Sequence, residues 1–191
     1  HIATNACMQV FGGHGFIKEW GMEQFVRDNR INMIYEGTNT IQSLDLLGRK
    51  VLGNQGATLK KFGKLVGQLV AEEGVNEKMA EFINPIAILG EQMTKFTTEI
   101  GFKGMQNPDE VGAAAVDYLR VAGHLVFGYL FARMAQVSLR AIANGSTDPF
   151  YTAKLQTARF YFAKLFPETV LLMRTARAGS KVLMDTDAAL A

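Results

Sequence analysis

The sequence predicts an all-α protein whose later part folds as an antiparallel, up-and-down helical bundle. Apolar residues recur three and four positions apart through most of the 191 residues, which is the spacing of one face of an α-helix. No stretch alternates apolar and polar residues, as a half-buried strand would. The hydrophobic content of 48% and the charged content of 20% are those of a folded globular protein.

Two short helices are predicted in the first part of the chain. The first covers residues 1–11 and ends at Gly12-Gly13, because glycine accepts the left-handed backbone that closes a helix. The second covers about residues 23–34, where apolar side chains are spaced for one face. Gly37 then ends this second helix.

A third helix and a domain boundary follow. Asn39 is predicted to cap this helix, with Gln42 three residues later completing a capping box. The turn at residues 54–56 contains Asn and Gly and separates two different apolar patterns. We therefore expect one domain at residues 1–53 and a helical extension at residues 54–191.

The extension begins with two amphipathic segments. Apolar residues form one stripe over residues 59–70 and a bundle-like seam over residues 79–100. Pro85 lies inside the seam, and because proline has no backbone N–H it should start or kink the helix there.

Two long helices complete the extension. Residues 107–110 read Asn-Pro-Asp-Glu, a start signal for a helix that runs to Asn144-Gly145. Residues 148–149 read Asp-Pro and open another helix, which ends near Gly179. Pro167 should kink this last helix.

Composition excludes several function classes. The net charge of +2 is too small to indicate nucleic-acid binding. His1, His14 and His124 are scattered without ligand spacing, so no metal site is predicted, and His124 is read as a hydrogen-bonded core histidine. The single cysteine, Cys7, is expected to be packed and fits a reducing compartment, so a cytoplasmic location is expected.

No transmembrane segment is predicted. The longest strongly apolar run, residues 121–132, is flanked by Arg120 and Arg133 and is shorter than the ~20 residues that a membrane span needs. It is read as a buried core helix. The chain starts at His1 within a helical pattern, which suggests a piece of a longer protein.

Glu36 is the candidate for acid–base chemistry. It follows the apolar residues Met33, Ile34 and Tyr35, which would raise the pKa of its carboxyl if they pack around it. It precedes Gly37, where the backbone can approach a ligand closely. A carboxylate in this setting suits proton abstraction from a weakly acidic carbon. A solvent-facing glutamate at the end of a helix is the alternative.

The segment from Ile34 to Gln42 reads Ile-Tyr-Glu-Gly-Thr-Asn-Thr-Ile-Gln, and the segment from Gln9 to Gly15 reads Gln-Val-Phe-Gly-Gly-His-Gly. Together they resemble the acyl-CoA dehydrogenases over roughly the first quarter of the chain. The resemblance implies that Glu36 removes the α-proton of an acyl-CoA thioester and that FAD accepts the β-hydrogen as hydride, giving a trans-2-enoyl-CoA. It implies FAD contacts from Gln9, Gly12, Gly13, Thr38 and Thr40, and substrate contacts from Tyr35 and Gly37.

The sequence departs from the family pattern at three positions. Thr40 stands where many members have Glu or Gln, and Ser43 and Gly48 stand where many have arginine. The run from Leu44 to Val51, followed by a long helical tail, looks most like the bacterial branch that includes 3-methylmercaptopropionyl-CoA dehydrogenase.

Two functions follow as hypotheses. The first is the C-terminal part of a flavin-dependent acyl-CoA dehydrogenase, inactive by itself, with electron-transferring flavoprotein as acceptor and a homo-oligomeric assembly. The second is a non-catalytic helical module for interaction or oligomerisation. Replacing Glu36 in the full-length protein distinguishes them.

Overall fold

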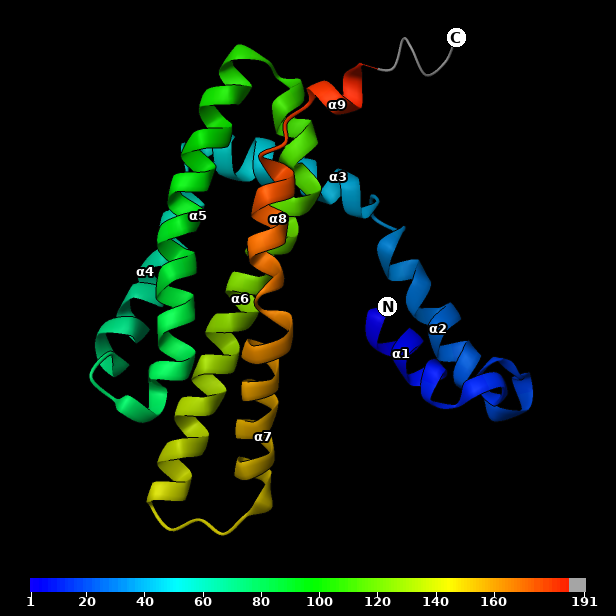
Figure 1. The fold of residues 1–191 in the computed structure, drawn as a ribbon, viewed down its shortest axis with the longest axis vertical. Coiled ribbons are helices and arrows are strands. Elements are labelled where there is room, and N and C mark those ends of the chain that lie inside the picture. Colours follow the sequence, from blue (N-terminus) through cyan, green and yellow to red (C-terminus); the bar gives the residue numbers. More distant parts are fainter. Residues whose placement is uncertain (186–191) are drawn as a thin grey trace. The chain divides into compact units, whose positions relative to one another are not determined.

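The computed structural model describes residues 1–185, which form helices and turns without any strand (Figure 1). The all-α prediction is therefore confirmed for the described part of the chain. The chain divides into two compact units, His1–Gln42 and Ser43–Ala191, and each is described by itself.

The first unit is built on two helices, α1 (Ile2–Val10) and α2 (Met22–Arg30), which pack against each other. Short 3-10 turns over Gly12–Phe16 and Lys18–Trp20 join them. Neither helix contains a buried residue, and most large apolar side chains of the unit are exposed. Cys7 is also exposed, so the prediction that it is packed is wrong for this chain.

Helix α3 (Asn39–Leu44) begins one residue earlier than the predicted capping box requires. The backbone N–H of Ile41 donates to the hydroxyl of Thr38 at 3.4 Å, so Thr38 rather than Asn39 takes the capping position. The Gln42 amide donates instead to the backbone carbonyl of Glu36 at 2.6 Å. The prediction of a capping box from Asn39 to Gln42 is therefore wrong.

The second unit contains six further helices with one helix at the centre. Helix α6 packs against α5, α7 and α8, and these elements lie side by side in Figure 1. The buried apolar side chains of the described chain, from Leu47 to Ala176, all belong to this unit and form one core. The helices are α4 (Ala57–Glu73), α5 (Ala80–Gln106), α6 (Asp109–Ala143), α7 (Pro149–Phe160), α8 (Glu168–Ala176) and α9 (Lys181–Met184).

Helix α6 is long and apolar enough to cross a membrane by length and composition. In the structure it is the central helix of the bundle, and Tyr118, Val121 and Leu125 are buried along it. Gly128 allows the close approach of α5 and of the chain before α8, since a Cβ there would lie 2.8 Å from Phe166 and 2.9 Å from Ile86. One face of the apolar run is therefore buried in the core, as predicted, whereas Val126, Phe127 and Leu130 on the same run are exposed.

The predicted helix starts are confirmed where a polar side chain marks them. Asn107 accepts the backbone N–H of Asp109 at 3.1 Å, and Asp148 accepts that of Phe150 at 2.9 Å. Pro85 neither starts nor ends a helix, because α5 begins at Ala80 and continues past it.

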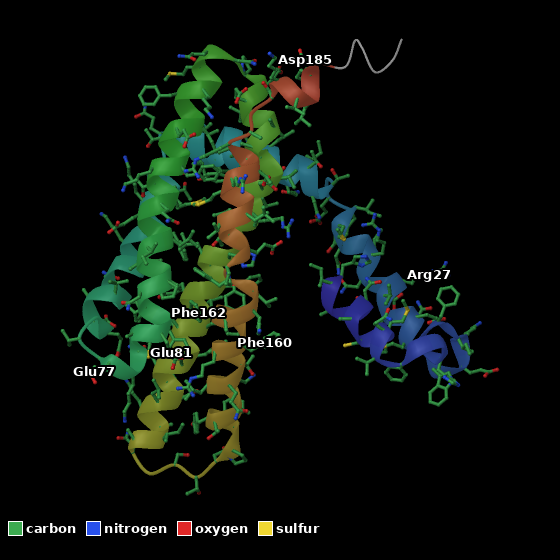
Figure 2. All side chains as sticks on the ribbon, viewed as in Figure 1. Arg27, Glu77, Glu81, Phe160, Phe162 and Asp185 are labelled. Atoms are coloured by element: carbon green, nitrogen blue, oxygen red, sulfur yellow. The ribbon has the colours of Figure 1, made fainter. Side chains whose placement is uncertain are left out.

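The interruption predicted at Pro167 is present between α7 and α8. A π-helical turn over Tyr161–Leu165 precedes it, and the N–H of Phe166 donates to the carbonyl of Tyr161 at 2.9 Å. The turn directs Phe162 against Phe82, with ring centroids 5.6 Å apart, while Phe160 is exposed (Figure 2). Because proline lacks an N–H, the wider turn ends the hydrogen-bond ladder just before it.

Candidate functional site

Glu36 occupies an unusual backbone conformation at the junction before α3. Its φ of 56° is left-handed, and the Gln42 amide holds its carbonyl. Gly37 is also left-handed, with φ 89°, and a Cβ there would lie 3.0 Å from the Ile41 Cγ2. Left-handed backbone is unfavourable for a residue with a Cβ, and residues strained in this way cluster at functional sites. The fold therefore fixes the direction in which Glu36 leaves the backbone.

The carboxylate of Glu36 is exposed, and so are its neighbours Ile34 and Tyr35. The predicted apolar surroundings are thus adjacent in sequence but do not bury this carboxylate within the described residues. Thr38 and Thr40 are exposed on the first turn of α3 and the residue before it. The candidate residues from Tyr35 to Thr40 therefore form one short, accessible segment.

The glycine-rich turn after α1 contains glycines of two kinds. Gly15 is required by the fold, because a Cβ there would lie 2.4 Å from the carbonyl oxygen of Met8. Gly12 has a left-handed φ of 59°, as a residue that ends a helix often has. At Gly13 a Cβ would meet nothing within 4 Å, so packing within this chain does not explain that glycine. A close approach of another molecule to the backbone would explain it.

The structure does not bring the two candidate segments together. Gln9, Gly12 and Gly13 precede α2, whereas Tyr35 to Thr40 follow it. The nine residues of α2 span about 13 Å at 1.5 Å per residue, so the two segments lie toward opposite ends of this helix.

Aromatic side chains flank the glycine-rich turn, which the sequence patterns did not indicate. The ring of Trp20 makes edge contacts with His14 and Phe11, at centroid distances of 5.2 and 6.4 Å. These contacts join the two 3-10 turns to the end of α1. The sequence signal that could have predicted these contacts is the presence of aromatic residues within and beside a glycine-rich segment.

Two polar clusters lie within the bundle. The His124 ring bonds to the Tyr161 hydroxyl at 2.9 Å and to the Glu168 carboxylate at 3.1 Å, and Arg120 also pairs with Glu168. Burial, with a smaller effect of the Glu168 charge, raises the pKa of the Tyr161 hydroxyl. His124 is therefore hydrogen-bonded as predicted, but it is partly buried at the edge of the core rather than inside it. Among residues 1–185 no group of His, Cys, Asp and Glu side chains could hold a metal ion.

Glu73 forms the second polar cluster and is 4% exposed. Burial acts to raise the pKa of its carboxyl, but hydrogen bonds from Gln136, Asn76 and Arg140 outweigh burial and hold the pKa below its ordinary value. The Arg140 guanidinium lies 2.6 Å and the Asn76 amide 2.8 Å from the carboxylate. These donors occupy the carboxylate oxygens of Glu73. The cluster therefore stabilises the fold and does not present a reactive group.

Two family models match the chain and together cover nearly all of it. Residues 1–52 match the acyl-CoA dehydrogenase C-terminal domain, and residues 58–187 match the model described as acetyl-CoA dehydrogenase C-terminal like. The first match contains both candidate segments.

Curated relatives show the same similarity. The chain is 35% identical to 3-methylmercaptopropionyl-CoA dehydrogenase of Ruegeria pomeroyi over 84% of this chain and 28% of that protein. It is 28% identical to a butyryl-CoA dehydrogenase of Syntrophomonas wolfei over 96% of this chain, and 25% identical to a broad-specificity linear acyl-CoA dehydrogenase of Mycobacterium tuberculosis over 95%. Each of these two alignments covers 31% of the relative, so the chain spans less than a third of these proteins.

Proposed function

The chain belongs to the acyl-CoA dehydrogenase family, and we propose that it forms the C-terminal part of a flavin-dependent enzyme that converts an acyl-CoA into a trans-2-enoyl-CoA. The observation that supports this proposal is Glu36, an exposed residue with left-handed backbone inside the segment that matches the family's C-terminal domain.

We propose two domains: residues 1–53, which contain the base, and a helical extension at residues 54–191. The two family matches, which leave only residues 53–57 between them, support this division. The compact units divide earlier, after Gln42, because residues 43–53 pack on the bundle. The segment that links base and extension is thus anchored in the second unit.

Glu36 is proposed to act as the base. Its carboxylate takes the proton from the α-carbon of the thioester, and the β-hydrogen leaves with its electron pair, so the acyl chain is oxidised by two electrons. FAD, when bound, supplies the acceptor for that electron pair. The left-handed backbone of Glu36 and Gly37 sets the starting point of the side chain, which favours one direction of approach to the substrate.

Tyr35 and Gly37 are proposed to lie along the substrate, since both are accessible beside the base. Gln9, Gly12, Gly13, Thr38 and Thr40 are proposed to contact FAD. Gly13 fits this role, because its open surroundings leave room for a ligand beside the backbone. The Thr38 hydroxyl accepts the N–H of Ile41, which leaves its own proton free to be donated to the cofactor.

The proposed partners follow from the reaction and from the surface. A reduced flavin must pass on its electrons, and electron-transferring flavoprotein is the proposed acceptor. The exposed apolar side chains of the first unit, such as Val10 and Phe16, favour packing against other protein, and a homo-oligomer is proposed. A cytoplasmic location is also proposed.

A non-catalytic interaction module is the second candidate function. The observation that favours it is the first unit itself, whose two helices bury none of their residues. Helices of this kind are stable in a protein when another surface covers their apolar side chains. The unusual backbone at Glu36 favours the catalytic role, because a docking helix needs no such residue.

Replacing Glu36 by glutamine in the full-length protein tests the proposed function. Glutamine keeps the size of the side chain but cannot accept the α-proton, so turnover of an acyl-CoA should fall by about 10²- to 10⁴-fold. Turnover is measured with an artificial electron acceptor, alongside circular dichroism and the flavin absorbance. Unchanged turnover in a folded, flavin-loaded variant would support the interaction module instead.

A matched control replaces Glu19, which belongs to the same unit but not to the motif, by glutamine and should leave turnover unchanged. The purified 191-residue chain should show no turnover with acyl-CoA and added FAD, because its base is exposed to water. Turnover by that chain would contradict the proposal that this C-terminal part is inactive by itself.

A further inference from the structure

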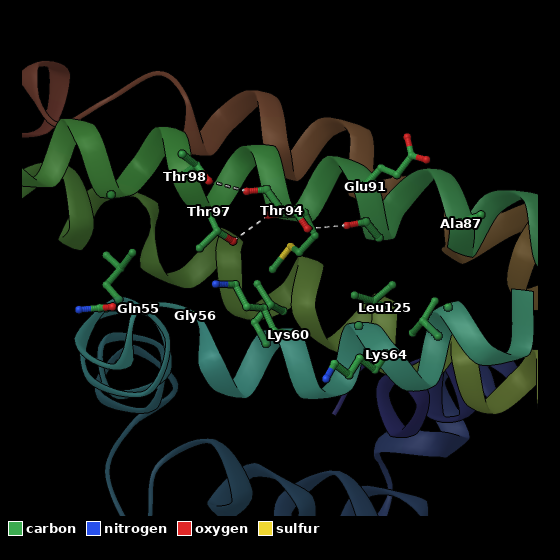
Figure 3. Close-up of a pocket in the computed structure, with 18 of the residues that line it drawn as sticks. Gln55, Gly56, Lys60, Lys64, Ala87, Glu91, Thr94, Thr97, Thr98 and Leu125 are labelled. Carbon is green, nitrogen blue, oxygen red and sulfur yellow. Dashed lines mark hydrogen bonds between the residues drawn. The ribbon is translucent and has the colours of Figure 1, made fainter.

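A groove of about 1020 Å³ lies between α4 and α5 in the second unit (Figure 3). Buried apolar side chains form its floor, among them Val66, Met93 and Leu125. Pockets that bind small apolar molecules have volumes of about 300 to 1,000 Å³. The groove is therefore large enough for a ligand of substantial size.

Glycines keep the groove open. Gly63 and Gly67 on α4 both line it, and a Cβ at either position would meet nothing within 4 Å. Glycine destabilises the interior of a helix relative to alanine, so it is usually explained by a close contact. Among the described residues no such contact is found at either glycine. What the two glycines do is leave space along one face of α4.

The opposite wall offers few hydrogen bonds to a ligand. The hydroxyls of Thr94, Thr97 and Thr98 each donate to a carbonyl of their own helix, at distances of 3.2, 2.7 and 3.0 Å (Figure 3). A threonine whose hydroxyl is used in this way presents mainly its methyl group to its surroundings. An apolar occupant suits this wall better than a polar one.

One edge of the groove is positively charged. Lys60 and Lys64 lie one helical turn apart on α4, and neither has a hydrogen-bond or ion-pair partner among the described residues. Glu91 also borders the groove, but its carboxylate points away from it (Figure 3). The edge therefore complements an anion at one side of an apolar channel.

We propose that this groove binds a single-chain amphiphile, with its apolar tail between α4 and α5 and its anionic head at Lys60 and Lys64. The α4 side of the groove extends from Gly56 to Val70, about 20 Å at 1.5 Å per residue, which accommodates an extended dodecyl chain. A fatty carboxylate and an acyl-CoA share this chemistry. The site contains none of residues 1–51 and does not depend on the role of Glu36.

Titration calorimetry of the 191-residue chain with dodecanoate, below the concentration at which it forms micelles, tests the proposal. Saturable binding of one dodecanoate is expected. Hexanoate should bind at least about tenfold more weakly because it buries fewer methylenes. Dodecyltrimethylammonium, which carries the opposite charge, should also bind more weakly. A parallel titration with dodecanoyl-CoA distinguishes the two ligands. Tighter binding of dodecanoyl-CoA than of dodecanoate would assign the groove to acyl-CoA.

Two pairs of variants locate the binding. Gly63→Leu with Gly67→Leu fills the groove and should weaken dodecanoate binding at least about tenfold, whereas Gly112→Leu, in open surroundings on α6, should not. Lys60→Gln with Lys64→Gln should weaken it about threefold to fivefold, and Lys61→Gln, on the same helix but outside the groove, should leave it unchanged.

Circular dichroism establishes that each variant is folded. If the leucine pair does not fold, the lysine pair decides the question alone, because its side chains lie on the surface. The proposal is overturned by three results: no saturable binding, equal binding to both variant pairs and the wild type, or binding only to phospholipid vesicles. A change of oligomeric state in the leucine pair without loss of dodecanoate binding would assign the groove to a second copy of the chain, and would also overturn it.

Discussion

At the scale of single residues, the sequence indicated which side chains are candidates for function better than it indicated how those side chains are buried and paired. Glu36 and Gly37 were recognisable from their order, but the left-handed backbone of Glu36, which is unfavourable for a residue with a Cβ, was not predicted. The hydrogen bonding of His124 was predicted correctly, although the residue is partly buried rather than in the core. Glu73 was not predicted, since its partners Gln136 and Arg140 come from a helix more than sixty residues away.

Glu73→Gln should destabilise the 191-residue chain by about 2 kcal/mol at pH 7, because the buried hydrogen bonds from charged and polar donors lose their charged acceptor. Urea unfolding followed by circular dichroism measures this change. Glu72→Gln is the matched control: its carboxylate is 58% exposed and 4.0 Å from Arg133, so its loss should cost well under 1 kcal/mol.

The same residue should make stability depend on acidity. The folded-state pKa of Glu73 is lowered from 4.5, so its contribution is complete above the unfolded-state pKa and is lost as the pH falls through the lower folded-state value. Part of the decline in unfolding free energy below about pH 5 should therefore disappear in Glu73→Gln. An identical acid profile in variant and wild type would contradict this assignment.

At the scale of elements, helix starts were predictable and helix interruptions were only partly so. Asn107 and Asp148 cap helices where their sequence signals lie, because a cap needs only neighbouring residues. The π-helical turns at Asp45–Val51 and Tyr161–Leu165 were not predicted, since they accommodate packing against distant helices. Pro85 is tolerated within α5, which local propensity does not reveal.

Two glycines of α6 differ in how closely neighbouring side chains approach them, so the effects of alanine at the two positions can be compared. Gly128→Ala should destabilise the chain by about 1 to 3 kcal/mol, since its Cβ would overlap Phe166 and Ile86. Gly123→Ala on the same helix has open space and should raise stability by up to about 1 kcal/mol. Urea midpoints measure both, and equal changes would show that α6 is less tightly packed than the distances indicate.

At the scale of the whole molecule, the two units differ in what holds them together. The predicted all-α class is confirmed, but the sequence did not reveal that all buried apolar side chains of the described chain belong to the second unit. Apolar periodicity identifies a face that can be buried and says nothing about what covers it. Val10 and Phe16, with exposures of 86% and 78%, illustrate the difference.

Removing residues 1–42 should therefore leave the bundle folded. The urea midpoint of residues 43–191 should match that of the 191-residue chain, because its core is complete. Self-association, measured by light scattering at high concentration, should decrease with the loss of the exposed apolar side chains. Loss of cooperative unfolding, or equal association of both chains, would contradict this account.

The left-handed backbone of two non-glycine residues lowers the stability of the fold. Only Glu36 and Gln55 among the described residues accept it, and the first is the proposed base while the second borders the proposed amphiphile groove. Glycine at either position would relieve a strain of about 1 kcal/mol or more. Selection for folding alone would therefore favour glycine at both places. Gln55 closes the 3-10 turn Leu52–Asn54, where left-handed backbone is common, so Glu36 is the residue whose strain supports the proposed role as a base.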